Sequence, residues 1–81
     1  MSRVAKLVEA MRANPRADWT ISDVQAVADA HGISCKSPKR GSHYVLKHPT
    51  IAGNLTIPAR RPIKQLYIRL LLQMVDSLEG R

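Results

Sequence analysis

The sequence predicts an α+β domain in which two helices, three antiparallel strands and a last helix follow one another, with the helices on one face of the sheet. Apolar residues near both ends of the chain recur three and four positions apart, as in amphipathic helices. The stretch between them loses this spacing and gains β-branched residues, turn residues and prolines, which favours short strands. With 81 residues, of which 44% are hydrophobic, the chain can build one small core. We therefore expect residues 1–81 to form a single domain.

The first third of the chain predicts two helices. Residues 3 to about 13 carry apolar side chains at i, i+3, i+4 and i+7, and an Asn-Pro pair ends this pattern. Ser22 and Gln25 match a capping box at the start of a second helix, about Ser22–His31. Gly32 is suited to end that helix, because glycine adopts the left-handed conformation that follows many helices.

Three strands are expected next, at Ile33–Lys36, His43–His48 and Leu55–Ile57. The segments between them are rich in Gly, Ser, Pro and Asn, so they are predicted to be turns. Pro58 is placed close to the end of the third strand, since proline cannot donate a hydrogen bond within a sheet. Together these segments predict a small antiparallel meander.

The last helix has the strongest helical pattern in the sequence. Pro62 is expected at its first position, where a proline is tolerated, and Gly80 at its end. One face carries an apolar stripe, formed by Ile63, Leu66, Tyr67, Leu70, Leu71, Met74 and Leu78. This stripe predicts packing against the rest of the core.

The charge of the chain points to a polyanionic partner. Thirteen Lys and Arg residues against six Asp and Glu give a net charge of +7. No acidic residue occurs between Ala30 and Val75, whereas eight basic residues do. A solvated surface is the simpler interpretation of such a run, but its length favours binding to nucleic acid or to an acidic protein.

Several classes of protein are disfavoured. Two lobes enclosing a cofactor would need a longer chain, and no apolar run approaches the roughly 20 residues of a membrane-spanning helix. The single cysteine, Cys35, allows no intramolecular disulfide, and no signal peptide is apparent at the N-terminus. We expect a cytoplasmic protein.

Histidine and cysteine could bind a metal, but their pattern does not favour it. His43 and His48 have the spacing of half a zinc site, and the other half is missing. On a strand the two would also lie on opposite faces. No catalytic triad or phosphate-binding loop is recognisable. We expect no metal and no cofactor, a structural role for the Cys35 thiol, and a core position for Trp19 rather than a role in stacking on bases.

His43 directly follows a basic turn and is the remaining candidate for chemistry. An imidazole accepts or donates protons near neutral pH, and nearby Lys and Arg side chains stabilise a phosphate in its transition state. These groups suit cleavage of RNA by its own 2′-hydroxyl. From the residues alone, a structural histidine is the more common alternative.

Four segments resemble the HicA family of bacterial toxins, which are mRNA interferases. They are Gly41-Ser42-His43-Tyr44, Val45–Pro49, Leu55–Pro58 and the last helix with Arg69 and Leu71-Leu72-Gln73. The resemblance covers about Ser22 to Met74 and implies a double-stranded-RNA-binding-domain-like fold, α-β-β-β-α, with His43 as the catalytic residue. Residues 22–79 would form the family core, and residues 1–14 a helical addition at the N-terminus.

The chain departs from the family at two places. A second histidine, which many members carry two positions after the strand proline, is replaced here by Arg60. The Gly-Thr-Leu that often begins the last helix is replaced by Leu66-Tyr67-Ile68. The role of that second histidine therefore cannot be transferred to this chain.

The resemblance and the residues together predict the toxin of a type II toxin–antitoxin pair, a metal-independent endoribonuclease that cleaves mRNA and binds an acidic HicB-type antitoxin. His43 is the expected general acid or base. The residues expected to bind RNA are Lys39, Arg40, Ser42 and Lys47 at the phosphate and Arg60, Arg61 and Lys64 along the track. Tyr44 is expected either at this site or against the helices. The alternatives are a non-catalytic RNA-binding module of the same fold and a DNA-binding accessory protein.

Overall fold

The structure is a computed structural model that describes residues 3–37, 39 and 41–80. Its elements are α1 (Arg3–Ala13), α2 (Ile21–Ala30), β1 (Ser34–Lys36), β2 (His43–Lys47), β3 (Leu55–Pro58) and α3 (Gln65–Glu79). The predicted α+β order, two helices, three strands and a helix, is confirmed. Within the described ranges, no helix is long and apolar enough to cross a bilayer.

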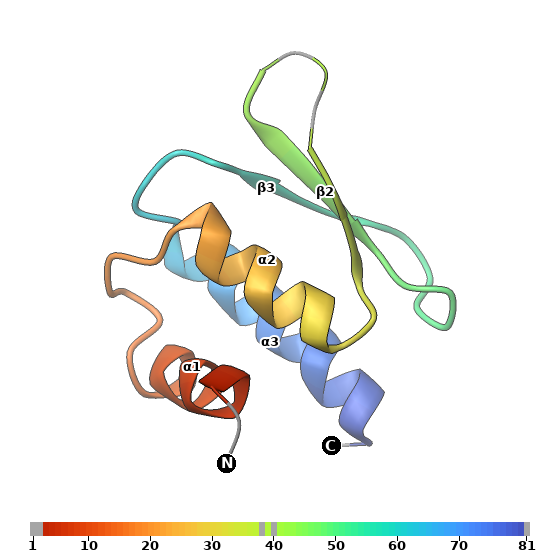
Figure 1. Ribbon diagram of the computed structural model, residues 1–81, viewed down its shortest axis with the longest axis horizontal. Helices are drawn as coiled ribbons and strands as arrows, with labels where there is room; N and C mark the ends of the chain where they lie inside the picture. Colours follow the sequence, from red (N-terminus) through yellow and green to blue (C-terminus); the bar gives the residue numbers. More distant parts are fainter. Residues whose placement is uncertain (1–2, 38, 40, 81) are drawn as a thin grey trace.

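The elements form three layers, with the sheet above α2 and α3 and with α1 below these two helices (Figure 1). Helix α2 contacts β1, α3 contacts β3, and α1 packs against both α2 and α3. The helices therefore lie on one side of the sheet, as predicted, and its other face is free of helices.

The sheet is antiparallel with the order β1-β2-β3. Cys35 of β1 pairs with Leu46 of β2, and Leu46 pairs in turn with Leu55 of β3. Because paired residues point to the same side, these three side chains lie on the helix side of the sheet. The predicted strands differ from the observed ones by one residue at three ends.

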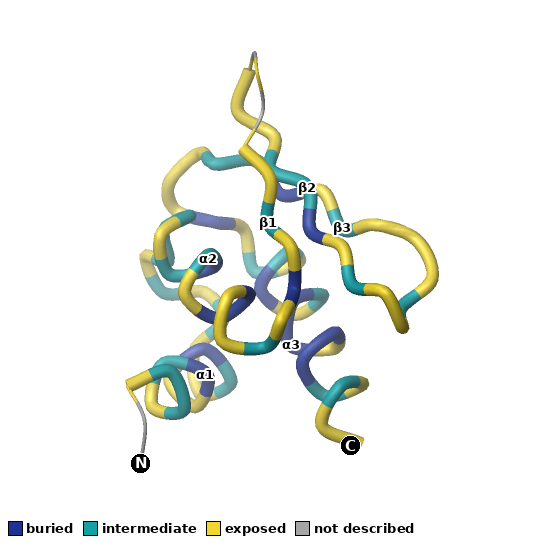
Figure 2. The backbone as a smooth tube through the Cα atoms, turned by 45° about the vertical axis from the view of Figure 1, so that its right-hand side comes forward, coloured by how far each residue is buried: buried dark blue, intermediate teal, exposed yellow. Residues whose placement is uncertain are grey.

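One hydrophobic core joins all three layers. Met11 of α1, Val27 of α2, Leu46 of β2 and Leu71 of α3 are all fully buried in it. In Figure 2 the buried segments of the helices and of β2 face one another across the interior. Trp19 packs against this core as predicted, while its indole N–H donates to the Asn14 carbonyl at 2.9 Å.

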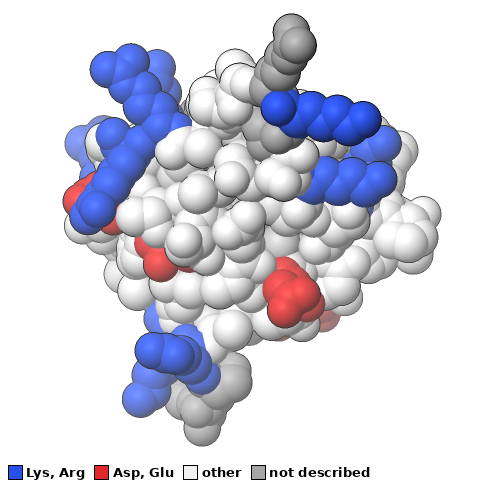
Figure 3. All heavy atoms as spheres, turned by 45° about the horizontal axis from the view of Figure 1, so that its top comes forward, with Lys and Arg blue, Asp and Glu red and all other residues white. Residues whose placement is uncertain are grey.

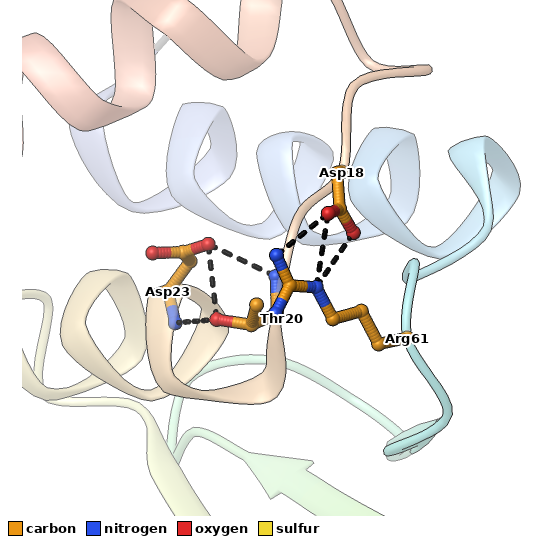
Figure 4. Close-up of polar contacts among 4 residues, drawn as sticks. All are labelled: Asp18, Thr20, Asp23 and Arg61. Carbon is orange, nitrogen blue, oxygen red and sulfur yellow. Dashed lines mark hydrogen bonds and ion pairs between the residues drawn. The ribbon is translucent and has the colours of Figure 1, made fainter.

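The start of α2 differs from the prediction. Its capping box is formed by Thr20 and Asp23: the Asp23 backbone N–H donates to the Thr20 hydroxyl at 3.3 Å, and the Thr20 N–H to the Asp23 carboxylate at 2.9 Å (Figure 4). The predicted box at Ser22 and Gln25 is wrong, because Ser22 already lies inside the helix. The end of α2 is as predicted: Gly32 has a φ of 69°, and the Ile33 N–H donates to the Ala28 carbonyl at 2.9 Å.

Helix α3 begins later than predicted. Pro62 is outside the helix, and Lys64 is the N-cap, with an extended backbone. The reason lies in Ile63, which is buried in the core and donates its backbone N–H to the Trp19 carbonyl at 2.8 Å. This contact fixes the preceding segment against the α1–α2 linker, so the helix begins only after it. Gly80 ends the helix in the left-handed conformation, as predicted.

Candidate nucleic-acid interface

The side chains of β2 alternate between the two faces of the sheet. Tyr44 and Leu46 point toward the helices, and both belong to the core or pack against it. His43, Val45 and Lys47 therefore point to the helix-free face. His43 and Lys47 are exposed there.

Strand pairing adds residues from β1 and β3 to the same face. Lys36 pairs with Val45, Ser34 with Lys47, Thr56 with Val45 and Pro58 with His43. We call this surface the open face; its residues are Ser34, Lys36, His43, Val45, Lys47, Thr56 and Pro58.

Lys36 is a site residue that the sequence analysis did not single out. Its pairing with Val45 places it diagonally between His43 and Lys47 on the open face, within reach of long side chains. Lys36 is exposed. The sequence contained a signal for it, because Lys36 ends the first predicted strand and lies in the acid-free stretch. Recognising it required the register of β1 against β2.

His43 is held at the start of β2 by the backbone around it. The Ala59 N–H donates to the Ser42 carbonyl at 2.6 Å, which extends the β2–β3 ladder beyond the pair of His43 and Pro58. Gly41, two residues before His43, has a φ of 82°, a value that residues with a Cβ rarely adopt. His43 is exposed, and its ring makes no hydrogen bond to the described residues.

The other two histidines have structural contacts. His31 donates through Nδ1 to the Val27 carbonyl at 2.7 Å, and its Nε2 lies 3.9 Å from a carboxylate oxygen of Glu79. His48 accepts the Thr50 backbone N–H at Nδ1, at 3.1 Å, in the turn that leaves β2. Across the residues that the structure describes, no three His, Cys, Asp or Glu side chains form a group that could hold a metal ion.

The predicted phosphate ligands are distributed over two regions. Lys47 lies on the open face, and Lys39 and Ser42 are exposed in the β1–β2 turn. Arg40 was predicted beside them and lies outside the described residues. The second region is the β3–α3 connection, where Arg60, Arg61 and Lys64 are exposed. Figure 3 shows basic side chains in separate groups with uncharged surface between them, so the charge does not form one unbroken track on this view.

Arg61 differs from its neighbours because it is already paired. Its Nε donates to both carboxylate oxygens of Asp18, at 2.8 and 3.0 Å, and its Nη2 donates to one of them at 2.6 Å (Figure 4). These hydrogen bonds hold the pKa of the Asp18 carboxyl below its ordinary value. Arg61 therefore has a carboxylate partner on the α1–α2 linker, which offsets part of its positive charge.

Tyr44 and Cys35 lie on the helix side of the sheet. Of the two positions expected for Tyr44, the structure has it packed against the core. The Cys35 thiol is also half-buried, and burial raises its pKa. Neither group faces His43.

None of the acidic residues belongs to a strand of the sheet. All six occur on the helices or on the α1–α2 linker: Glu9, Asp18, Asp23, Asp29, Asp76 and Glu79. The open face therefore presents one imidazole and two lysines with no carboxylate among its residues. Such a surface attracts phosphates and offers a proton carrier beside them.

Comparison with protein-family models, with curated proteins and with solved structures found no match to this chain.

Proposed function

We propose that this protein is a ribonuclease that cleaves RNA at the open face, with His43 as its general acid or base. The observation that carries the proposal is the exposed imidazole of His43 on a face that holds Lys36 and Lys47 and no carboxylate. The HicA resemblance of the surrounding residues agrees with this chemistry. It extends the proposal to a toxin that acts on mRNA and is neutralised by an acidic HicB-type antitoxin.

The reaction follows from the groups on the open face. The 2′-oxygen of a ribose attacks the adjacent phosphorus, the bond to the 5′-oxygen breaks, and the products are a 2′,3′-cyclic phosphate and a 5′-hydroxyl. One proton leaves the 2′-hydroxyl and another reaches the departing 5′-oxygen. A single imidazole serves one of these transfers at a time, and we assign the other to solvent water, because the open face is exposed.

The lysines contribute electrostatic stabilisation. The phosphorane-like transition state carries more negative charge on its oxygens than the bound phosphodiester does. Lys36, on the neighbouring strand and diagonal to His43, is positioned to attract that charge. Lys47 lies four residues along the same strand, about 13 Å away at the usual rise per residue, so it suits a phosphate further along the RNA chain rather than the one that reacts.

Replacement of His43 tests the proposal. We expect His43→Ala to lower the rate of RNA cleavage by at least ~10², because general acid–base catalysis typically contributes 10²- to 10⁴-fold. RNA binding should persist, and added imidazole should restore part of the rate. The measurement is the digestion of a labelled RNA in excess chelator, where the wild type is expected to remain active. Circular dichroism first establishes that the variant is folded.

His48→Ala is the matched control, since it removes an imidazole five positions along the chain that contacts Thr50 and lies outside the open face. It should cleave at the wild-type rate. A substrate with deoxyribose at the cleaved position should resist the enzyme. Undiminished cutting by His43→Ala contradicts the proposal, and RNA binding without cleavage by the wild type identifies a non-catalytic RNA-binding module.

A further inference from the structure

A cavity of about 320 Å³ lies where β3 passes into α3, beside the open face. Its walls are formed by Pro58, Arg60, Arg61, Pro62, Lys64 and Tyr67. Two proline rings and one phenol ring provide apolar surface, and three basic residues surround it. Tyr67 is half-buried, packs against the core and also lines the cavity.

The cavity is continuous with the surroundings of His43. Pro58 both lines the cavity and pairs with His43 across the β2–β3 ladder. The next residue, Ala59, is bonded through its backbone N–H to Ser42. A chain of nucleotides that places one phosphate at His43 can therefore place an adjoining nucleotide in the cavity.

Two of the three basic residues are available to a ligand. Arg60 and Lys64 are exposed, and neither forms an ion pair within the described part of the chain. Arg61, in contrast, lines the cavity while its guanidinium is hydrogen-bonded to Asp18 (Figure 4). The cavity thus combines an aromatic surface with two free positive charges.

The α1–α2 linker keeps this region in place. Besides the pair of Asp18 and Arg61, the Trp19 carbonyl accepts the Ile63 N–H at 2.8 Å, and Arg16 donates to the Gln65 side chain at 2.5 Å. The backbone hydrogen bond ends at the buried Ile63 and fixes the connection between β3 and α3 there, whereas the two side-chain contacts are exposed and contribute little. A connection held at Ile63 lowers the entropic cost of ordering the cavity on binding.

We infer that this cavity binds one nucleotide of single-stranded RNA, with the base against Tyr67 and the flanking phosphates at Arg60 and Lys64. The inference rests on the proposed function, since it names the neighbour of the nucleotide cleaved at His43. Aromatic side chains stack on bases of any sequence, and lysine and arginine hold the backbone. An acidic peptide would use the two charges but would have no comparable use for the ring.

The test is the affinity for a short fluorescent RNA, measured by anisotropy in a His43→Ala background so that the RNA stays intact. We expect Tyr67→Leu to weaken binding about tenfold, because leucine fills a similar volume but offers no π-face. Tyr67→Phe should bind like the parent. Leu66→Ala is the matched control: Leu66 is the exposed neighbour on α3, lies outside the cavity, and should have no effect.

A second measurement leaves Tyr67 in place. Ring resonances of Tyr67 should shift when the RNA is added, and should shift much less with an abasic RNA of the same length. Unchanged affinity of Tyr67→Leu, or equal shifts with both RNAs, overturns the inference while leaving catalysis at His43 intact. The inference is also overturned if Tyr67→Leu weakens binding to an acidic protein partner and leaves RNA binding unchanged. Failure of the wild type to bind or cleave any RNA contradicts the proposed function itself.

Discussion

Adjacent residues of like charge have different roles in this molecule. Arg60 extends into solvent without an ion pair among the described residues, whereas the guanidinium of Arg61 is bound by three hydrogen bonds to Asp18. An unpaired cation that binds a phosphate releases counterions from the RNA, which makes binding depend on salt. A cation that is already paired with a carboxylate contributes much less to this dependence. The two arginines should therefore differ in their effect on RNA binding.

The salt dependence of RNA binding measures this difference. We expect Arg60→Gln to reduce the slope of log K against log salt concentration by about 0.7, the value for one phosphate contact on a single strand. The charge-neutral control is the double variant Asp18→Asn/Arg61→Gln, which removes the ion pair and should leave the slope unchanged. If both variants reduce the slope of log K against log salt concentration equally, Arg61 also contacts an RNA phosphate.

At the scale of elements, local sequence determines where helices end more reliably than where they begin. Gly32 and Gly80 end α2 and α3 in the left-handed conformation, as expected for glycine after a helix. The start of α3 depends on a tertiary contact, whereas the capping box of Thr20 and Asp23 that starts α2 is a local pattern that competes with the one at Ser22 and Gln25. Thr20, the N-cap of α2, directly follows Trp19, whose carbonyl accepts the backbone N–H of Ile63. This hydrogen bond joins the start of α2 to the segment that precedes α3.

Alanine substitutions at the start of α2 distinguish the two capping patterns. Thr20→Ala should lower the free energy of unfolding by about 1 kcal/mol, the usual cost of losing an N-cap hydroxyl. Ser22→Ala, the control, removes the same hydroxyl from an exposed helical position and should have little effect. The measurement is urea denaturation followed by circular dichroism. A larger loss from Ser22→Ala than from Thr20→Ala would contradict the observed cap.

In the molecule as a whole, the helices and the α1–α2 linker carry the acidic side chains and the sheet carries none. Helix α1 is attached through the core and by an ion pair between Arg12 and Asp76 of α3. The carboxylates lie with the helices and the linker, and the open face of the sheet has only basic and neutral side chains. This separation leaves a cationic surface that an acidic protein can cover.

Partner binding can be followed by chemical labelling. We expect an acidic protein encoded by the neighbouring reading frame to bind the open face and to protect Lys36 and Lys47 from acetylation. Lys6, on α1 at the opposite end of the layers, is the internal control and should stay reactive. The complex should also melt at a higher temperature, because a ligand of the folded state stabilises it. Protection of Lys6 but not of Lys36 and Lys47 would contradict binding at the open face.

Three features could be predicted from the residues alone: the order of the elements, the helix ends at Gly32 and Gly80, and the positive charge around His43. These features depend on residue type and on spacing over a few positions, which the chain contains locally. Only the folded chain shows that Lys36 lies beside His43, that Asp18 pairs with Arg61, that Tyr67 lines a cavity, and that α3 begins after Lys64. Lys36 and His43 lie on neighbouring strands, so their proximity depends on the register of β1 against β2. Asp18 and Trp19 contact Arg61 and Ile63 from a distant part of the chain, and core packing brings these segments together, which no local pattern encodes.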